Sequence, residues 1–77
     1  MATFWHLYET GKNSDPLEFA TEAIARETAM SMLQAELRES SRWEPSSSRP
    51  GGYDLMMRVY GGKKKYTCVA TIAPFTA

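Results

Sequence analysis

A thiol, an imidazole and a carboxylate are the side chains of this sequence that could together do covalent chemistry: Cys68, His6 and Asp54. They have the residue types of a nucleophile, its base and an orienting acid. Cys68, however, falls in the middle of a predicted strand, on the face expected to be buried, where cysteine acts as a small hydrophobe. His6 fits a partly buried strand histidine. The sequence therefore predicts a protein that is not an enzyme.

The sequence also has few residues that could bind a metal ion or a phosphate group. One histidine and one cysteine are the only soft metal ligands in the chain, whereas a structural zinc site takes four ligands. Gly51-Gly52 and Gly61-Gly62 are turn sequences rather than a glycine-rich phosphate loop. We expect neither a metal nor a cofactor.

A basic run could bind instead of catalyse. Lys63, Lys64 and Lys65 follow Tyr60 closely, and Arg58 lies on the same predicted hairpin. Lysines beside aromatic rings can grip phosphates while bases stack on the rings. Lysines at a hairpin tip also keep it soluble and discourage edge pairing, and we favour this second interpretation.

Trp43 stands in a polar stretch between Arg42 and Glu44. Residues 41–52 have the Ser, Pro and Gly content of a loop, which we expect to be long and flexible. Trp43 is expected to pack back on the end of the preceding helix, or else to be an exposed aromatic anchor of the kind found at interfaces.

The elements that must position these residues follow from periodicity and turn chemistry. Thr3 to Glu9 suits a strand, and apolar residues at helical spacing predict a helix from about Ala25 to Ser40. Residues 53–60 and 65–73 predict a hairpin that turns at Gly61-Gly62 and ends before Pro74.

Residues 17–24 are ambiguous. Asp15, Pro16 and Glu18 resemble the start of a helix, but a helix from there to residue 39 would be about 36 Å long. A compact domain of this size has a radius of gyration near 11–12 Å, so that helix would protrude. Because the segment from Leu17 to Ala23 alternates with period two, we prefer a strand.

The predicted fold is therefore α+β: a four-stranded antiparallel sheet with one helix packed on one face, in the order β-β-α-β-β. One helix can cover only one face of such a sheet. The face predicted to lie under the helix holds Leu17, Phe19, Leu55, Met57, Val59, Cys68, Ala70 and Ile72. The parity of the last strand puts Tyr66 on the same face as Cys68. Met56, Arg58, Tyr60 and Val69 are left on the other face, where they either mark a contact or are the scattered apolar residues of any surface.

The 77 residues make one domain, residues 1–77. A chain of this length buries only about 60% of its unfolded surface, so oligomerisation or a partner would help it. A single cysteine excludes an internal disulfide. No apolar run reaches the roughly 20 residues of a membrane span, and no signal peptide is recognisable. These features predict a cytoplasmic protein without a membrane partner.

Charge is unevenly distributed although the formal net charge is zero. Residues 1–40 carry three basic and seven acidic side chains, a net charge of −4, and residues 41–77 carry six basic and two acidic ones, a net charge of +4. Such an asymmetry can orient a partner. It differs from the overall positive charge of a general nucleic-acid binder.

Phe19 to Ala23, followed by the helix around Arg26 to Ala29, resembles a pattern of small phage proteins. In size and element order the chain is similar to anti-CRISPR proteins that bind type I surveillance complexes. This resemblance covers about residues 3–72 and carries no matching functional motif. Many such inhibitors are acidic DNA mimics, whereas this chain is neutral. The resemblance implies a phage-encoded inhibitor that acts in the host cytoplasm on a CRISPR-Cas subunit.

The sequence thus favours a non-enzymatic protein-binding module, an anti-CRISPR-like inhibitor by resemblance, with a target protein or a second copy as partner. The alternative is a small nucleic-acid-binding domain that uses the uncovered sheet face and the lysine tip. The candidate partner-binding residues are Trp43, Met56, Arg58, Tyr60, Lys63, Lys64 and Lys65.

Overall fold

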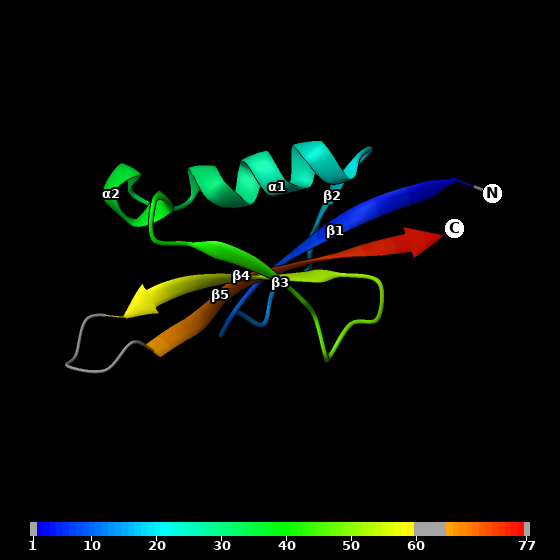
Figure 1. The fold of residues 1–77 in the computed structure, drawn as a ribbon. Coiled ribbons are helices and arrows are strands. Elements are labelled where there is room, and N and C mark those ends of the chain that lie inside the picture. The colour runs from blue at the N-terminus through cyan, green and yellow to red at the C-terminus, as the bar shows by residue number, and fades with distance from the viewer. Residues whose placement is uncertain (1, 60–64, 77) are drawn as a thin grey trace.

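The computed structural model describes residues 2–59 and 65–76. It is an α+β fold in which two helices lie on one side of an antiparallel sheet (Figure 1). The elements are β1 (Thr3–Glu9), β2 (Leu17–Phe19), α1 (Glu22–Ser31), α2 (Ala35–Arg38), β3 (Arg42–Pro45), β4 (Tyr53–Val59) and β5 (Lys65–Thr76). No helix in the described part of the chain is long and apolar enough to cross a membrane.

The sheet has five strands in the order β2-β1-β5-β4-β3, so the prediction of four strands was wrong. The additional strand, β3, lies in the segment expected to be a loop and pairs with β4 from Tyr53 to Met56. Arg42–Pro45 is short, and its proline and the serines that follow concealed the alternation of Trp43 with charged neighbours. The expected antiparallel pairing of β4 with β5 is confirmed.

Helix α1 begins three residues earlier than expected. The Thr21 side chain accepts a hydrogen bond from the Ile24 backbone N–H at 3.2 Å, which caps the first turn. The helix stops at Ser31 because Arg38 folds back and its Nε donates to the carbonyl oxygens of Met30 at 2.9 Å and Leu33 at 3.0 Å. The single predicted helix is therefore two helices, joined by a turn that the Arg38 side chain of α2 stabilises.

The ambiguous segment is a strand only at its start. Leu17–Phe19 pairs antiparallel with Trp5–Leu7, which confirms the preferred interpretation for these three residues. The expected strand to Ala23 was too long, since Thr21 is the N-cap of α1. The end of β5 was set too early, because β5 runs through Pro74 to Thr76. β4 does not reach that far, so the missing N–H of Pro74 falls at an edge of the sheet.

The core is small and lies between α1 and the middle of the sheet. Its fully buried members are Leu7, Ala25, Ala29, Leu55, Ala70 and Ile72. Trp43 packs against this cluster, and the Arg26 guanidinium of α1 lies 5.0 Å from the Trp43 ring and 4.5 Å from the Tyr53 ring. Stacked between two aromatic rings, Arg26 fixes α1 over β3 and β4.

Candidate functional site

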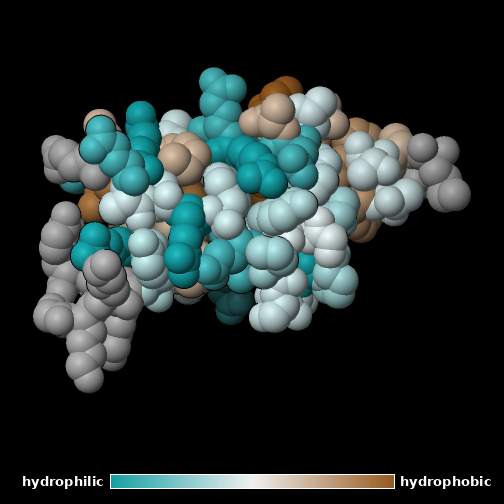
Figure 2. Space-filling model, in the orientation of Figure 1, coloured by the Kyte–Doolittle hydropathy of each residue, from teal (hydrophilic) through white to brown (hydrophobic). Residues whose placement is uncertain are grey.

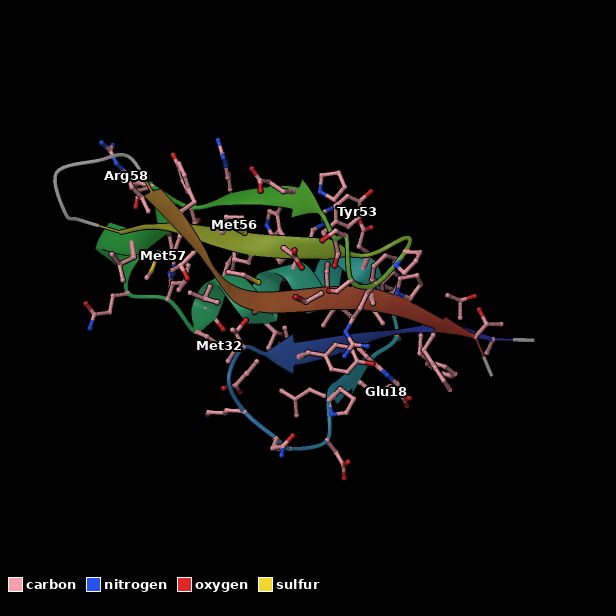
Figure 3. All side chains as sticks on the ribbon, turned by 90° about the horizontal axis from the view of Figure 1, so that it is seen from below. Glu18, Met32, Tyr53, Met56, Met57 and Arg58 are labelled. Carbon is pink, nitrogen blue, oxygen red and sulfur yellow. The ribbon has the colours of Figure 1, made fainter. Side chains whose placement is uncertain are left out.

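The face of the sheet turned away from α1, which we call the open face, carries the candidate site. Register pairs define its members, because residues directly opposite each other on paired strands point to the same side. They are Phe4, His6, Tyr8, Glu18, Arg42, Glu44, Asp54, Met56, Arg58, Tyr66, Cys68, Thr71, Ala73 and Phe75. Figure 3 looks onto this face, with α1 behind the strands.

The middle of the open face is covered by the loop that joins β3 to β4. The Arg49 guanidinium lies 3.5 Å from the centre of the Tyr8 ring. A Cβ built on Gly52 would lie 2.4 Å from the Ile72 carbonyl oxygen, so this loop rests directly on β5. Thr71 and Ala73 are consequently buried, at 8% and 7% exposure. The expectation that nothing shields this face was wrong for its middle.

This loop also has backbone hydrogen bonds of its own. The Gly52 N–H donates to the Arg49 carbonyl at 2.9 Å, and the Ser46 N–H donates to the Gly52 carbonyl at 3.0 Å. The flexibility expected for residues 41–52 stays a prediction, now confined to residues 46–52, since the first part of that segment is β3.

A β-bulge puts three residues on the face opposite to the predicted one. Leu55 pairs with Ala70 but Met56 pairs with Cys68, which leaves Val69 as the extra residue. Cys68 and Tyr66 therefore lie on the open face rather than under the helix, and Val69 packs against the core rather than facing outward. Between the hairpin and Ala70, the residues of β5 therefore lie on the faces opposite to those predicted from the sequence.

Beyond the covered middle, five side chains form what we call the arginine patch: Arg42, Met56, Arg58, Tyr66 and Cys68. The Arg42 guanidinium lies 4.0 Å from the Tyr66 ring centre and pairs with Glu44 at 2.7 Å. Met56 and Arg58 follow each other along β4 (Figure 3). Arginine, tyrosine and methionine are enriched at the cores of protein interfaces. Here the stacking of the arginine on the tyrosine ring holds both side chains in place.

The other predicted site residues fall into two groups. Tyr60, Lys63 and Lys64 lie outside the described residues, and Lys65 is the first residue of β5. Trp43 is half-buried on the helix side of the sheet, against the core. The structure thus brings Met56 and Arg58 together and places Trp43 on the opposite face, under Arg26 rather than at the end of the helix.

The residues with catalytic side-chain types are separated. The Cys68 thiol contacts the hydroxyls of Thr10 at 3.5 Å and Thr71 at 3.7 Å. His6 Nε2 lies 3.1 Å from Glu18 Oε1. His6 pairs with Ala73 along β5, so it is roughly 15 Å from Cys68 at about 3.3 Å per residue. This arrangement gives the thiol no histidine base.

Metal binding finds no support in the described residues, where no three His, Cys, Asp or Glu side chains gather as ligands. Asp54 accepts a hydrogen bond from the Thr71 hydroxyl at 2.7 Å and is thereby committed to the sheet.

No family model, curated protein or solved structure matches the chain. Three members of the arginine patch, Arg42, Tyr66 and Cys68, were missed as partner-binding residues. Arg42 was assigned to a loop, and Tyr66 and Cys68 to the covered face through the undetected bulge. The Arg-Trp-Glu alternation of residues 42–44 was the available signal for the first.

Proposed function

We propose that the protein is a non-enzymatic cytoplasmic binding module that contacts another protein through the arginine patch. The observation that carries the proposal is the arrangement of the exposed Arg42, which is stacked on Tyr66 and paired with Glu44, beside the half-buried Met56 on the open face. Binding through groups already ordered in the free protein loses less conformational entropy on association.

Charge on the open face favours a protein over a nucleic acid. Among the described residues of the open face and of the loop that covers it, three arginines, Arg42, Arg49 and Arg58, are matched by three carboxylates, Glu18, Glu44 and Asp54. Phosphate backbones are bound by surfaces with an excess of positive charge. Arg42 also occupies one face of the Tyr66 ring, which removes a platform on which a base could stack.

The resemblance to anti-CRISPR proteins names one partner class. Under this proposal the protein inhibits a bacterial defence complex by covering the surface of one of its subunits. A purified type I surveillance complex is therefore a defined partner to test beside unfractionated lysate.

The test is affinity capture with paired variants. The tagged protein is incubated with bacterial lysate, treated or untreated with nuclease, and with the purified complex. Arg58→Ala and Met56→Ala remove patch side chains, while Lys12→Ala and Met32→Ala remove similar side chains in a loop and at the end of α1. Truncating an interface anchor costs on the order of 1–3 kcal/mol, so patch variants should bind about 5- to 150-fold more weakly.

The result that supports the proposal is nuclease-resistant capture that the two patch variants lose and the two control variants keep. Capture that all four variants retain would exclude the arginine patch. Circular dichroism of each variant checks that the fold is intact.

The alternative, a nucleic-acid-binding domain, is favoured by the lysine run that adjoins Arg58 in the sequence. It expects nuclease-sensitive capture. It also expects that Lys63, Lys64 and Lys65 changed together to Gln would flatten the salt dependence of binding to a labelled single-stranded oligonucleotide. The loss would be about one unit of slope for each phosphate contact removed.

A further inference from the structure

Strand β3 forms one border of the sheet, and its outer edge is open to a partner. The strand order β2-β1-β5-β4-β3 leaves β3 paired on one side only, with β4. In Figure 3 it is the outermost green strand, and no helix or strand of the described residues lies beyond it. Such an edge presents backbone N–H and C=O groups with which another strand can pair.

The register of β3 identifies the backbone groups that point outward. In an antiparallel pair, every second residue bonds to the neighbouring strand, and the residues between them point away from it. The Ser46 N–H donates to the Gly52 carbonyl at 3.0 Å, so the alternation makes Glu44 the next residue of β3 that bonds to β4. Trp43 and Pro45 therefore direct their backbone groups outward. Because Pro45 has no N–H, Trp43 offers the edge its donor.

A second copy of β3 can pair with this edge, antiparallel, about a two-fold axis at Trp43. In that register the Trp43 N–H of each copy donates to the Trp43 carbonyl of the other. An axis at Arg42 or Glu44 would fail, because both residues bond to β4. An axis at Pro45 would bring together residues that have no N–H. The backbone geometry of β3 thus favours one register.

The same register sets opposite charges against each other. Arg42 and Glu44 flank Trp43 and lie on the open face, where they pair with each other at 2.7 Å. The axis at Trp43 puts Arg42 of each copy directly opposite Glu44 of the other, and opposite charges in such positions stabilise strand pairing. Their side chains are 54% and 40% exposed, which leaves both accessible to a second partner. The charges of the two copies therefore alternate in sign around the axis.

This charge pattern selects a second copy as the occupant of the edge. A matching strand needs an acidic and a basic residue two positions apart in the complementary order, which β3 itself supplies. β2, the strand at the other edge, carries Glu18 as its only charge, so pairing with its own copy would gain no ion pair. Figure 2 looks at the molecule from the β3 side, and the middle of that surface is mainly teal and pale rather than brown. The edge thus suits a contact made by charge and backbone hydrogen bonds.

We propose that the protein self-associates through β3, by antiparallel pairing of residues 42–44 with the same residues of a second copy. The two sheets become one continuous sheet, with both arginine patches on the same face. Because β3 is short and Pro45 lacks a donor, dissociation constants on the order of 100 µM are expected. The inference does not rest on the target proposed for the arginine patch.

Charge reversal with complementation tests this pairing. In sedimentation equilibrium from about 10 µM to about 1 mM, the average mass of the wild type should rise from 8.7 kDa toward twice that value. Arg42→Glu and Glu44→Arg each put like charges opposite one another, so each variant alone should associate at least about 10-fold more weakly. An equal mixture of the two variants restores opposite charges at both positions and should associate about as strongly as the wild type.

Lys12→Glu is the matched control for charge. Lys12 is also exposed and paired with a carboxylate, Glu9 at 2.7 Å, but it lies outside β3, so this variant should associate as the wild type does. Fluorescently labelled Glu44→Arg should bind Arg42→Glu at least about 10-fold more tightly than it binds Lys12→Glu, although the two have the same net charge. Circular dichroism of each variant checks that the fold is intact.

A further measurement needs no variant. Hydrogen exchange of the Trp43 amide should slow as the wild-type concentration rises, because its N–H gains an acceptor, while exchange in β1 stays constant. A mass of 8.7 kDa at every concentration would overturn the inference. So would a mixture of the two reversal variants that associates no more strongly than either variant alone. Association that every variant keeps, with Trp43 exchange unchanged, would place the contact elsewhere on the molecule.

Discussion

Adding one methyl group at Gly52 should lift the loop of residues 46–52 off the open face. Its Cβ would lie 2.4 Å from the carbonyl oxygen of Ile72 and 3.0 Å from the Cβ of Ala73. Ordinary contact begins at 3.4 Å, so Gly52→Ala requires the loop to retreat by about 1.0 Å, the difference between 3.4 and 2.4 Å. The nearest obstacle is backbone, which cannot rotate away as a side chain can.

The expected cost is about 2 kcal/mol. If the loop stays in place, overpacking of this kind costs typically 1–3 kcal/mol. If the loop detaches, it keeps its internal hydrogen bonds but loses the stacking of Arg49 on Tyr8, worth about 0.5–2 kcal/mol, and the apolar contact with β5. A domain of this length has roughly 4–12 kcal/mol of stability, so the variant should remain folded.

Urea denaturation of wild type, Gly52→Ala and Gly11→Ala measures the difference. Gly11 has a φ of +81° and open space around its Cβ, so its substitution costs only the left-handed backbone, about 1 kcal/mol. The ring resonances of Tyr8 should also shift in Gly52→Ala. A Gly52→Ala variant no less stable than Gly11→Ala, with Tyr8 unchanged, would show that the loop does not rest on β5.

Three further outcomes test the assignment of faces and caps. Leu55→Ala should lower the free energy of unfolding by about 2–5 kcal/mol, whereas Met56→Ala, one residue along but on the open face, should change it by less than about 1 kcal/mol in the same urea titration. The Cys68 thiol should react with a disulfide reagent in the folded protein at a rate within about 10-fold of its rate in urea, because the bulge directs the thiol to the open face. A reaction slowed 1,000-fold or more, equivalent to roughly 4 kcal/mol of protection, would show that the thiol is buried in the core. Thr21→Ala should cost about 1 kcal/mol through loss of the cap to the Ile24 N–H, and Thr21→Ser should restore most of it.

The parts of the fold that follow from local pattern were predictable. The alternation in residues 53–59 and 65–73 located β4 and most of β5, and the apolar spacing located a helix near Ala29. The break after Ser31 could not be seen, because the apolar pattern continues through Leu33 and the break depends on Arg38 reaching back to two carbonyl groups.

The candidate site was predictable in part, since Met56 and Arg58 were assigned to the correct face from the parity of β4 alone. The bulge at Val69 has no glycine or proline to announce it. It comes with a contact between distant segments, where the Thr10 N–H donates to the Val69 carbonyl at 3.2 Å. The position of Arg49 is likewise tertiary, because it depends on a loop folding onto a strand more than 30 residues away in sequence.

The pairing of Thr3 with Thr76 puts the start of β1 beside the end of β5, at the opposite end of an elongated molecule from the end of β4 (Figure 1). The principal extents are 47 × 24 × 21 Å. A purification tag or fluorescent protein fused to either end would therefore stand near Phe75 and far from the arginine patch. Fusion proteins suit capture of a target through that patch.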